Sequence, residues 1–83
     1  MELIARDTRQ VGTALKRNRQ RRKLTQAQLG ERMHVRQATV SDLESGESDA
    51  QLSTLMDALA ALDLELLIRP RTTTSIRDLE DLF

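Results

Sequence analysis

A chain of 83 residues with one aromatic residue, Phe83, has room for one small domain with an aliphatic core, and so modest a core favours a partner subunit. It has no cysteine, no apolar run near the ~20 residues of a membrane span and too short an apolar start for a signal peptide, so we expect a soluble cytoplasmic protein without disulfides. The net charge of zero is divided: residues 1–36 hold ten Lys and Arg against three acidic residues (+7), and residues 37–83 hold three Arg against ten acidic residues (−7). This division suits one face for a polyanion, although a solvated surface with randomly placed charges is the alternative.

The first elements are an arm and a helix. Residues 1–6 contain Leu3-Ile4-Ala5 without a clear period, and they form either a flexible arm or a short edge strand. Asp7-x-x-Gln10 is the pattern of a capping box, so a helix begins at Asp7 and ends near Arg22. Its inner face follows helical spacing through Val11, Ala14, Leu15 and Asn18.

Two short helices follow at residues 26–33 and 37–44. Thr25-x-x-Gln28 is a second capping box, and Ser45-Gly46 ends the second of these helices. Only residues 34–36 separate them, which is too few for an antiparallel pair, so the helices must cross steeply as in a helix-turn-helix. Gly30 removes a side chain where the second helix has to approach closely.

A fourth helix is expected at residues 52–61, and a strand at 64–69. We expect the core to contain Val11, Leu15, Leu24, Leu29, Met33, Val40, Leu43, Leu52, Leu55, Met56, Leu59 and Leu62. Residues 64–69 alternate before Pro70 ends them, and a lone strand would pair with the same strand of a second copy in a two-fold dimer. The alternative is that this segment extends the fourth helix. The apolar residues of the predicted dimer strand are Leu64, Leu66, Leu67 and Ile68.

The last segment, residues 71–83, is a polar linker followed by an acidic amphipathic tail. Ser75-x-x-Asp78 is a capping pattern, and apolar residues after it share a helical face. A helix this short is marginal alone, so the tail is either disordered or ordered by a protein partner. The residues that we predict to dock on that partner are Ile76, Leu79, Leu82 and Phe83.

The helix at 37–44 presents a slim polar face that suits the DNA major groove. Gln bonds adenine through N6 and N7, Ala contacts a thymine methyl group, and Ser serves either base. The predicted base contacts are Arg36, Gln37, Ala38 and Ser41, and the alternative is an ordinary solvated helix face. The predicted phosphate contacts are residues near helix N-termini and basic residues of the first helix, namely Thr25, Gln26, Thr39, Lys16, Arg17 and Arg21.

Nothing in the sequence indicates catalysis. Ser41 has no base partner, no glycine-rich phosphate loop exists, and His34 is the only histidine. We therefore expect no enzyme, no metal site and no cofactor.

The stretch TQAQLGERMHVRQATVSDLESG resembles the helix-turn-helix of the Cro/C1-type (Xre) DNA-binding family. Gln26, Gly30, Thr39-Val40-Ser41 and Leu43-Glu44 fill the family's characteristic positions. The turn departs from the family, because His34 stands where Gly is usual, and a left-handed conformation costs His more than Gly. The resemblance implies base contacts from the positions named above. It also implies a structural ion pair between Arg19 and Glu44.

The stretch LSTLMDALAALDLELLIRPR, a helix running into a strand, is similar to HipB-type antitoxins. This resemblance implies a homodimer with palindromic operator DNA, a HipA-type serine/threonine kinase toxin as partner, and autoregulation in the bacterial cytoplasm and nucleoid. The expected fold is a mainly α, four- to five-helix Cro/C1-type domain at 7–70, with a C-terminal strand pairing across the dimer, an arm at 1–6 and a tail at 71–83. A stand-alone regulator without a toxin, and an interaction module that has lost DNA binding, are the alternatives.

Overall fold

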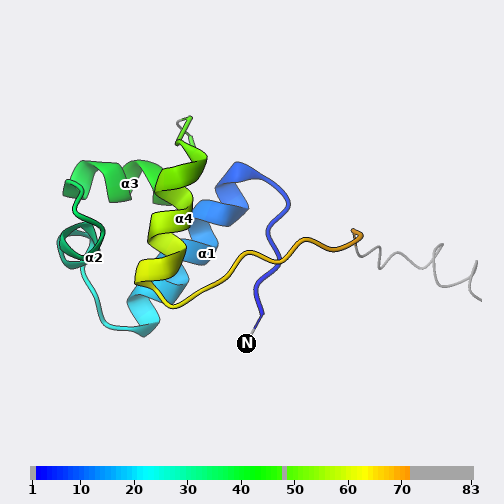
Figure 1. Cartoon of the computed structure of the whole chain (residues 1–83), viewed down its shortest axis with the longest axis horizontal. Coiled ribbons are helices and arrows are strands. Elements are labelled where there is room, and N and C mark those ends of the chain that lie inside the picture. The colour runs from blue at the N-terminus through cyan, green and yellow to red at the C-terminus, as the bar shows by residue number, and fades with distance from the viewer. Residues whose placement is uncertain (1, 48, 72–83) are drawn as a thin grey trace, which may run out of the picture.

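The computed structural model of the chain describes residues 2–47 and 49–71, and four helices form this part of the molecule. They are α1 (Thr8–Arg21), α2 (Gln26–Met33), α3 (Gln37–Ser45) and α4 (Leu52–Ala61). In Figure 1, α2 and α3 lie together at one end, and α4 is seen in front of α1. Contacts join α1 to α3, α2 to α3 and α2 to α4, so α3 packs against both α1 and α2, and α4 packs against α2. The predicted mainly α fold is confirmed, with helix bounds within about one residue of those expected.

The two predicted capping boxes differ in outcome. At α2, Thr25 Oγ1 accepts from the Gln28 amide at 3.1 Å and Gln28 Oε1 accepts from the Thr25 amide at 2.8 Å, so this box is complete. At α1, Asp7 Oδ1 accepts from the Gln10 amide at 2.7 Å. Gln10 Oε1, however, accepts from the amide of Arg6, at 2.6 Å, rather than from that of Asp7. The cap at Asp7 is therefore confirmed, and the reciprocal bond was assigned to the wrong residue.

Three of the helices end in the same way, with a non-glycine residue in the left-handed conformation followed by an apolar residue. The amide of the apolar residue bonds the carbonyl five residues earlier, which is a Schellman motif. Each apolar residue also packs against the core, so its burial offsets the strain at the residue before it. The left-handed residues are Lys23, His34 and Asp63, with φ of 56°, 58° and 56°, and Leu24, Val35 and Leu64 follow them.

The core is aliphatic, as predicted, but α4 contributes a different face from the one expected. The buried apolar residues of the described chain are Leu15, Leu29, Met33, Val40, Leu43, Ala58 and Leu62. The prediction of Leu52 and Met56 as core residues was wrong, since they are 68% and 43% exposed. Ala58 is fully buried and was not predicted. Helix α4 is apolar on two faces, and it buries the one that joins Leu55 and Leu59 to Ala58.

Two glycines permit close backbone approaches that bring α3 against its neighbours. A Cβ on Gly12 would lie 2.7 Å from the carbonyl oxygen of Leu43 and closer still to that of Glu44, so α1 meets the end of α3 backbone to backbone. A Cβ on Gly30 would lie 2.9 Å from the carbonyl oxygen of Val35. The close approach predicted at Gly30 exists, but the backbone that approaches belongs to the turn and not to a second helix.

After α4 the chain leaves the helical body. Residues 64–71 are not helical, which excludes the alternative that they extend α4. They are not paired as a strand within the described residues of this single chain, so strand pairing across a dimer stays a prediction. The tail residues Ile76, Leu79, Leu82 and Phe83 lie outside the described residues. Among the helices described, none is both long enough and apolar enough to cross a membrane.

Candidate DNA-binding surface

The packing of α3 decides which of its side chains meet solvent. Val40 and Leu43 are buried, and they turn the opposite side of the helix outward. Gln37, Ala38 and Ser41 are exposed on that outward side. Arg36 is also exposed, at the N-cap of α3, and its side chain makes no capping hydrogen bond. The four residues predicted to contact bases are therefore all accessible, at the N-cap and along the first turns of α3.

Behind this surface, Arg19 of α1 and Glu44 of α3 form a buried ion pair. Arg19 Nε lies 2.6 Å from Glu44 Oε2 and Arg19 Nη2 lies 3.0 Å from Glu44 Oε1. The two side chains are only 9% and 3% exposed. The third nitrogen, Arg19 Nη1, donates to the carbonyl of Leu24 at 2.8 Å. One guanidinium group thus joins α1, the connection before α2 and the end of α3 with geometry that only a planar fork of donors provides.

Two glutamines extend this pair to the surface. Gln26 Nε2 donates to Glu44 Oε1 at 3.1 Å, and Gln37 Nε2 donates to Gln26 Oε1 at 3.3 Å. From the sequence, we expected Gln26 to contact a phosphate and Gln37 to contact a base, and we did not predict the hydrogen bond between them. The sequence does hold a signal for this bond, because each glutamine is the first residue of one of the two helices of the helix-turn-helix.

The predicted phosphate contacts do not all lie together. Thr25, Gln26 and Thr39 lie at the starts of α2 and α3, beside the exposed surface of α3. Lys16 is four residues after Gly12 and three before Arg19, so it shares the α1 face that meets α3.

Arg17 and Arg21 lie elsewhere on α1. Arg17 lines a shallow hollow with Leu3 and Ile4 of the N-terminal arm. Arg21 is one helical turn further along the same side. Lys16 therefore lies on the side of α1 that packs against the end of α3, and these two arginines do not.

A family model described as "Helix-turn-helix" matches residues 15–68, which run from the middle of α1 to the segment after α4. The chain belongs to the Cro/C1-type helix-turn-helix family. This is a family of DNA-binding transcriptional regulators and not of enzymes, as the sequence led us to expect. The residues that carried the resemblance, from Thr25 to Gly46, lie wholly within the matched region.

Within this helix-turn-helix family, the chain is similar to HipB structures. A complex of a HipB variant with an O2 20mer matches with a TM-score of 0.80 and 26% identity, over 87% of this chain and 100% of that chain. A HipA–HipB–O2–O3 complex matches with a TM-score of 0.76 and 26% identity, over 83% of this chain and 97% of that chain. The HipB-type resemblance noted in the sequence is thereby confirmed.

A curated relative is the uncharacterized HTH-type transcriptional regulator y4dL of Sinorhizobium fredii (strain NBRC 101917 / NGR234). It is 31% identical over 68 residues, which are 82% of this chain. The chain spans only 35% of the length of that relative.

The buried ion pair gives a stability prediction. Arg19→Met should lower the free energy of unfolding by about 3–5 kcal/mol, because it leaves the carboxylate of Glu44 buried without its charged partner. Replacing both residues, Arg19→Met with Glu44→Met, should recover much of that loss. The measurement is urea denaturation followed by circular dichroism.

The matched control is Arg9→Met. Arg9 lies 3.5 Å from Glu47, but their side chains are 76% and 70% exposed, so the loss should stay below about 1 kcal/mol. An equal loss from Arg9→Met and Arg19→Met would contradict a structural role for the buried pair.

Proposed function

We propose that this chain is a sequence-specific repressor of transcription that reads a palindromic operator with α3 and serves as the antitoxin of a HipA-type serine/threonine kinase. The main support is the exposed start of α3, where Gln37, Ala38 and Ser41 share one outward side of a helix held rigidly from behind. A rigid, slim, polar helix suits the major groove, where base edges carry a distinct pattern of donors and acceptors.

The division of contacts follows from the placement of the side chains. Gln37 would bond a base edge, Ala38 and Ser41 would contact neighbouring bases, and Arg36 would reach a guanine edge or a phosphate. Contacts to the DNA backbone would come from the starts of α2 and α3 and from one basic residue of α1. The residues that we place on phosphates are Thr25, Gln26, Thr39 and Lys16.

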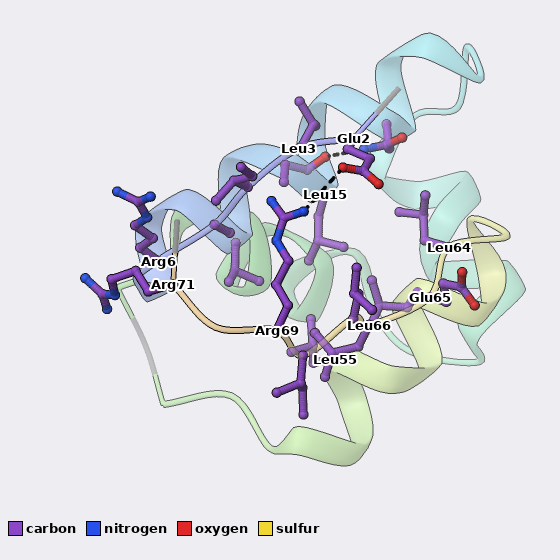
Figure 2. Close-up of a pocket in the computed structure, with 18 of the residues that line it drawn as sticks. Glu2, Leu3, Arg6, Leu15, Leu55, Leu64, Glu65, Leu66, Arg69 and Arg71 are labelled. Atoms are coloured by element: carbon purple, nitrogen blue, oxygen red, sulfur yellow. Dashed lines mark hydrogen bonds and ion pairs between the residues drawn. The ribbon is translucent and has the colours of Figure 1, made fainter. Parts of the chain in front are cut away.

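In a dimer, the α3 helix of the second copy would contact the other half-site of the palindromic operator. A groove of about 670 Å³ lies between the N-terminal arm, α1, α4 and residues 63–71, and Figure 2 shows residues that line it. Glu2 of the arm lies 3.7 Å from Arg69, and this exposed ion pair links the arm to the segment after α4. Leu66, Leu67 and Ile68 are 54%, 66% and 88% exposed. Within the described chain, the backbone of residues 65–70 makes no hydrogen bond to another backbone segment, so it is free to pair with a second copy.

The antitoxin role is supported by the likeness to a HipB chain whose complex also contains HipA. A stand-alone regulator is the second candidate, and the relative y4dL, named as a transcriptional regulator, favours it. Co-purification of this chain with a kinase encoded by its neighbouring gene would decide between them. If the chain shifts no promoter DNA, it is an interaction module and both candidates fail.

The first prediction here separates base contacts from phosphate contacts. Gln37→Ala should reduce the free energy of binding by roughly 1–3 kcal/mol for operators that keep the base pair read by Gln37. It should change binding little for operators that lack this base pair. Lys16→Ala should weaken binding to all sequences, and it should reduce the salt slope of log K by about 0.9. Binding is measured by fluorescence anisotropy on a set of operator variants at several salt concentrations.

Arg17→Ala is the matched control, since it removes the same charge from the other side of α1 and should change the salt slope less than Lys16→Ala. Similar behaviour of Gln37→Ala and Lys16→Ala across all operator variants would refute this division of roles.

The second prediction concerns the dimer. Leu66→Pro should convert a dimer to a monomer, because proline removes an N–H from the strand ladder. Size-exclusion chromatography with light scattering measures the mass. Glu65→Ala is the control, because it changes the neighbouring side chain but removes no backbone N–H. This variant should remain dimeric. A wild-type chain that is monomeric at micromolar concentration would rule out the dimer.

The third prediction concerns the kinase. A chain that ends at Pro70 should fold, dimerise and shift operator DNA like the full chain, but it should bind the HipA-type kinase more weakly. The reason is that the removed residues combine an acidic character with apolar Ile76, Leu79 and Phe83, which suits a groove with a basic rim. Calorimetry with and without residues 71–83 is the test, and equal affinities would leave the tail without a docking role.

A further inference from the structure

A chain of side-chain hydrogen bonds runs from the interior to the first residue of α3. Arg19 donates twice to Glu44, at 2.6 and 3.0 Å. Gln26 Nε2 donates to Glu44 at 3.1 Å, and Gln37 Nε2 donates to Gln26 Oε1 at 3.3 Å. Arg19 and Glu44 are buried, Gln26 is half-buried and Gln37 is exposed. The buried charge pair is thus connected to the proposed base contact through one intervening amide.

The direction of this chain follows from the chemistry of its buried end. An ionised carboxylate accepts hydrogen bonds and donates none, and Glu44 faces the guanidinium of Arg19 as its charged partner. Gln26 must therefore turn its nitrogen toward Glu44, and its oxygen then faces Gln37. Gln37 must in turn offer its nitrogen to that oxygen. The charge at residue 44 orients both amides.

The atoms that remain on Gln37 decide what it can recognise. One of its two N–H groups is used by Gln26, so it retains one donor and its Oε1 acceptor. Adenine presents an acceptor, N7, beside a donor, N6, in the major groove, and these match one donor and one acceptor. Guanine presents two acceptors, N7 and O6, and the acceptor of Gln37 would face one of them unpaired.

We infer that Glu44, acting through Gln26, is a specificity-setting positioning residue that makes Gln37 select adenine over guanine. This inference rests on the proposed reading of DNA by α3. A neutral amide at residue 44 would remove the constraint, because an amide both donates and accepts. Gln26 would then be free to turn over and donate to Gln37 Oε1. Gln37 would present its nitrogen outward, which matches the two acceptors of guanine.

The experiment selects sequences from a random double-stranded DNA library with the full-length chain at one fixed salt concentration. Gln37→Ala identifies the base pair that Gln37 reads, as the position at which preference disappears. The wild-type chain should prefer adenine to guanine there by roughly 5- to 150-fold. Glu44→Gln and Gln26→Met should each lower this ratio at least about fivefold, with preferences at other positions unchanged.

Two further variants keep the test independent of folding. Gln26→Met removes the intervening amide but leaves the Arg19–Glu44 pair, so it answers the question if Glu44→Gln does not fold by circular dichroism. Glu47→Gln is the matched control, since Glu47 also pairs with an arginine near the end of α3 but has no link to Gln26. Its adenine-to-guanine ratio should equal that of the wild type.

The possible failures are distinguishable. If Gln26→Met keeps the wild-type ratio, or if the wild-type chain prefers guanine at the position of Gln37, the inference is overturned. If the wild-type chain selects no sequence, or if Gln37→Ala loses preference at no position, the proposed DNA-reading function fails instead.

Discussion

The arrangement of the helices depends on the ion pair between Arg19 and Glu44. Two buried charges are tolerated only when they are paired and their remaining polar atoms are bonded. Here the carboxylate accepts three donors, and the guanidinium also bonds the carbonyl of Leu24. Helix α3 has only nine residues and would be marginal by itself, so its direction comes from these bonds and from the burial of Val40 and Leu43. These contacts on one side of α3 thereby determine which side of the helix is exposed.

Gly12 makes this ion pair geometrically possible. Its missing side chain lets the backbone of α1 reach the last turn of α3, where the carbonyl of Glu44 lies. With the helices so close, the long side chain of Arg19 meets the carboxylate within the interface and is shielded from water. A larger residue at position 12 would separate α1 from α3 and expose the pair, whose strength depends on low solvent access.

Folding brings charged residues of the basic half, residues 1–36, into contact with charged residues of the acidic half, residues 37–83. Four ion pairs join the two halves, namely Arg9 with Glu47, Arg19 with Glu44, Arg22 with Asp63 and Glu2 with Arg69. The excess positive charge near α3 is therefore smaller than the count for residues 1–36 suggests. Two exposed basic residues outside these pairs are Arg36, at the N-cap of α3, and Lys16, on the α1 face that packs against α3. Such residues suit phosphate contacts at a few positions.

The sequence alone determined the helices, their caps at Asp7 and Thr25, and the helix-turn-helix, because capping and turn preferences are local interactions within a few residues. It also placed Gln37, Ala38 and Ser41 on the outward side of α3, since a single apolar face identifies its opposite. Only the tertiary structure decided which of two apolar faces of α4 is buried, because that choice depends on the neighbours across the core. For the same reason it alone showed which side of α1 packs against α3, and it alone connected Gln37 through Gln26 to Glu44. These relations join residues distant in sequence, and no local pattern encodes them.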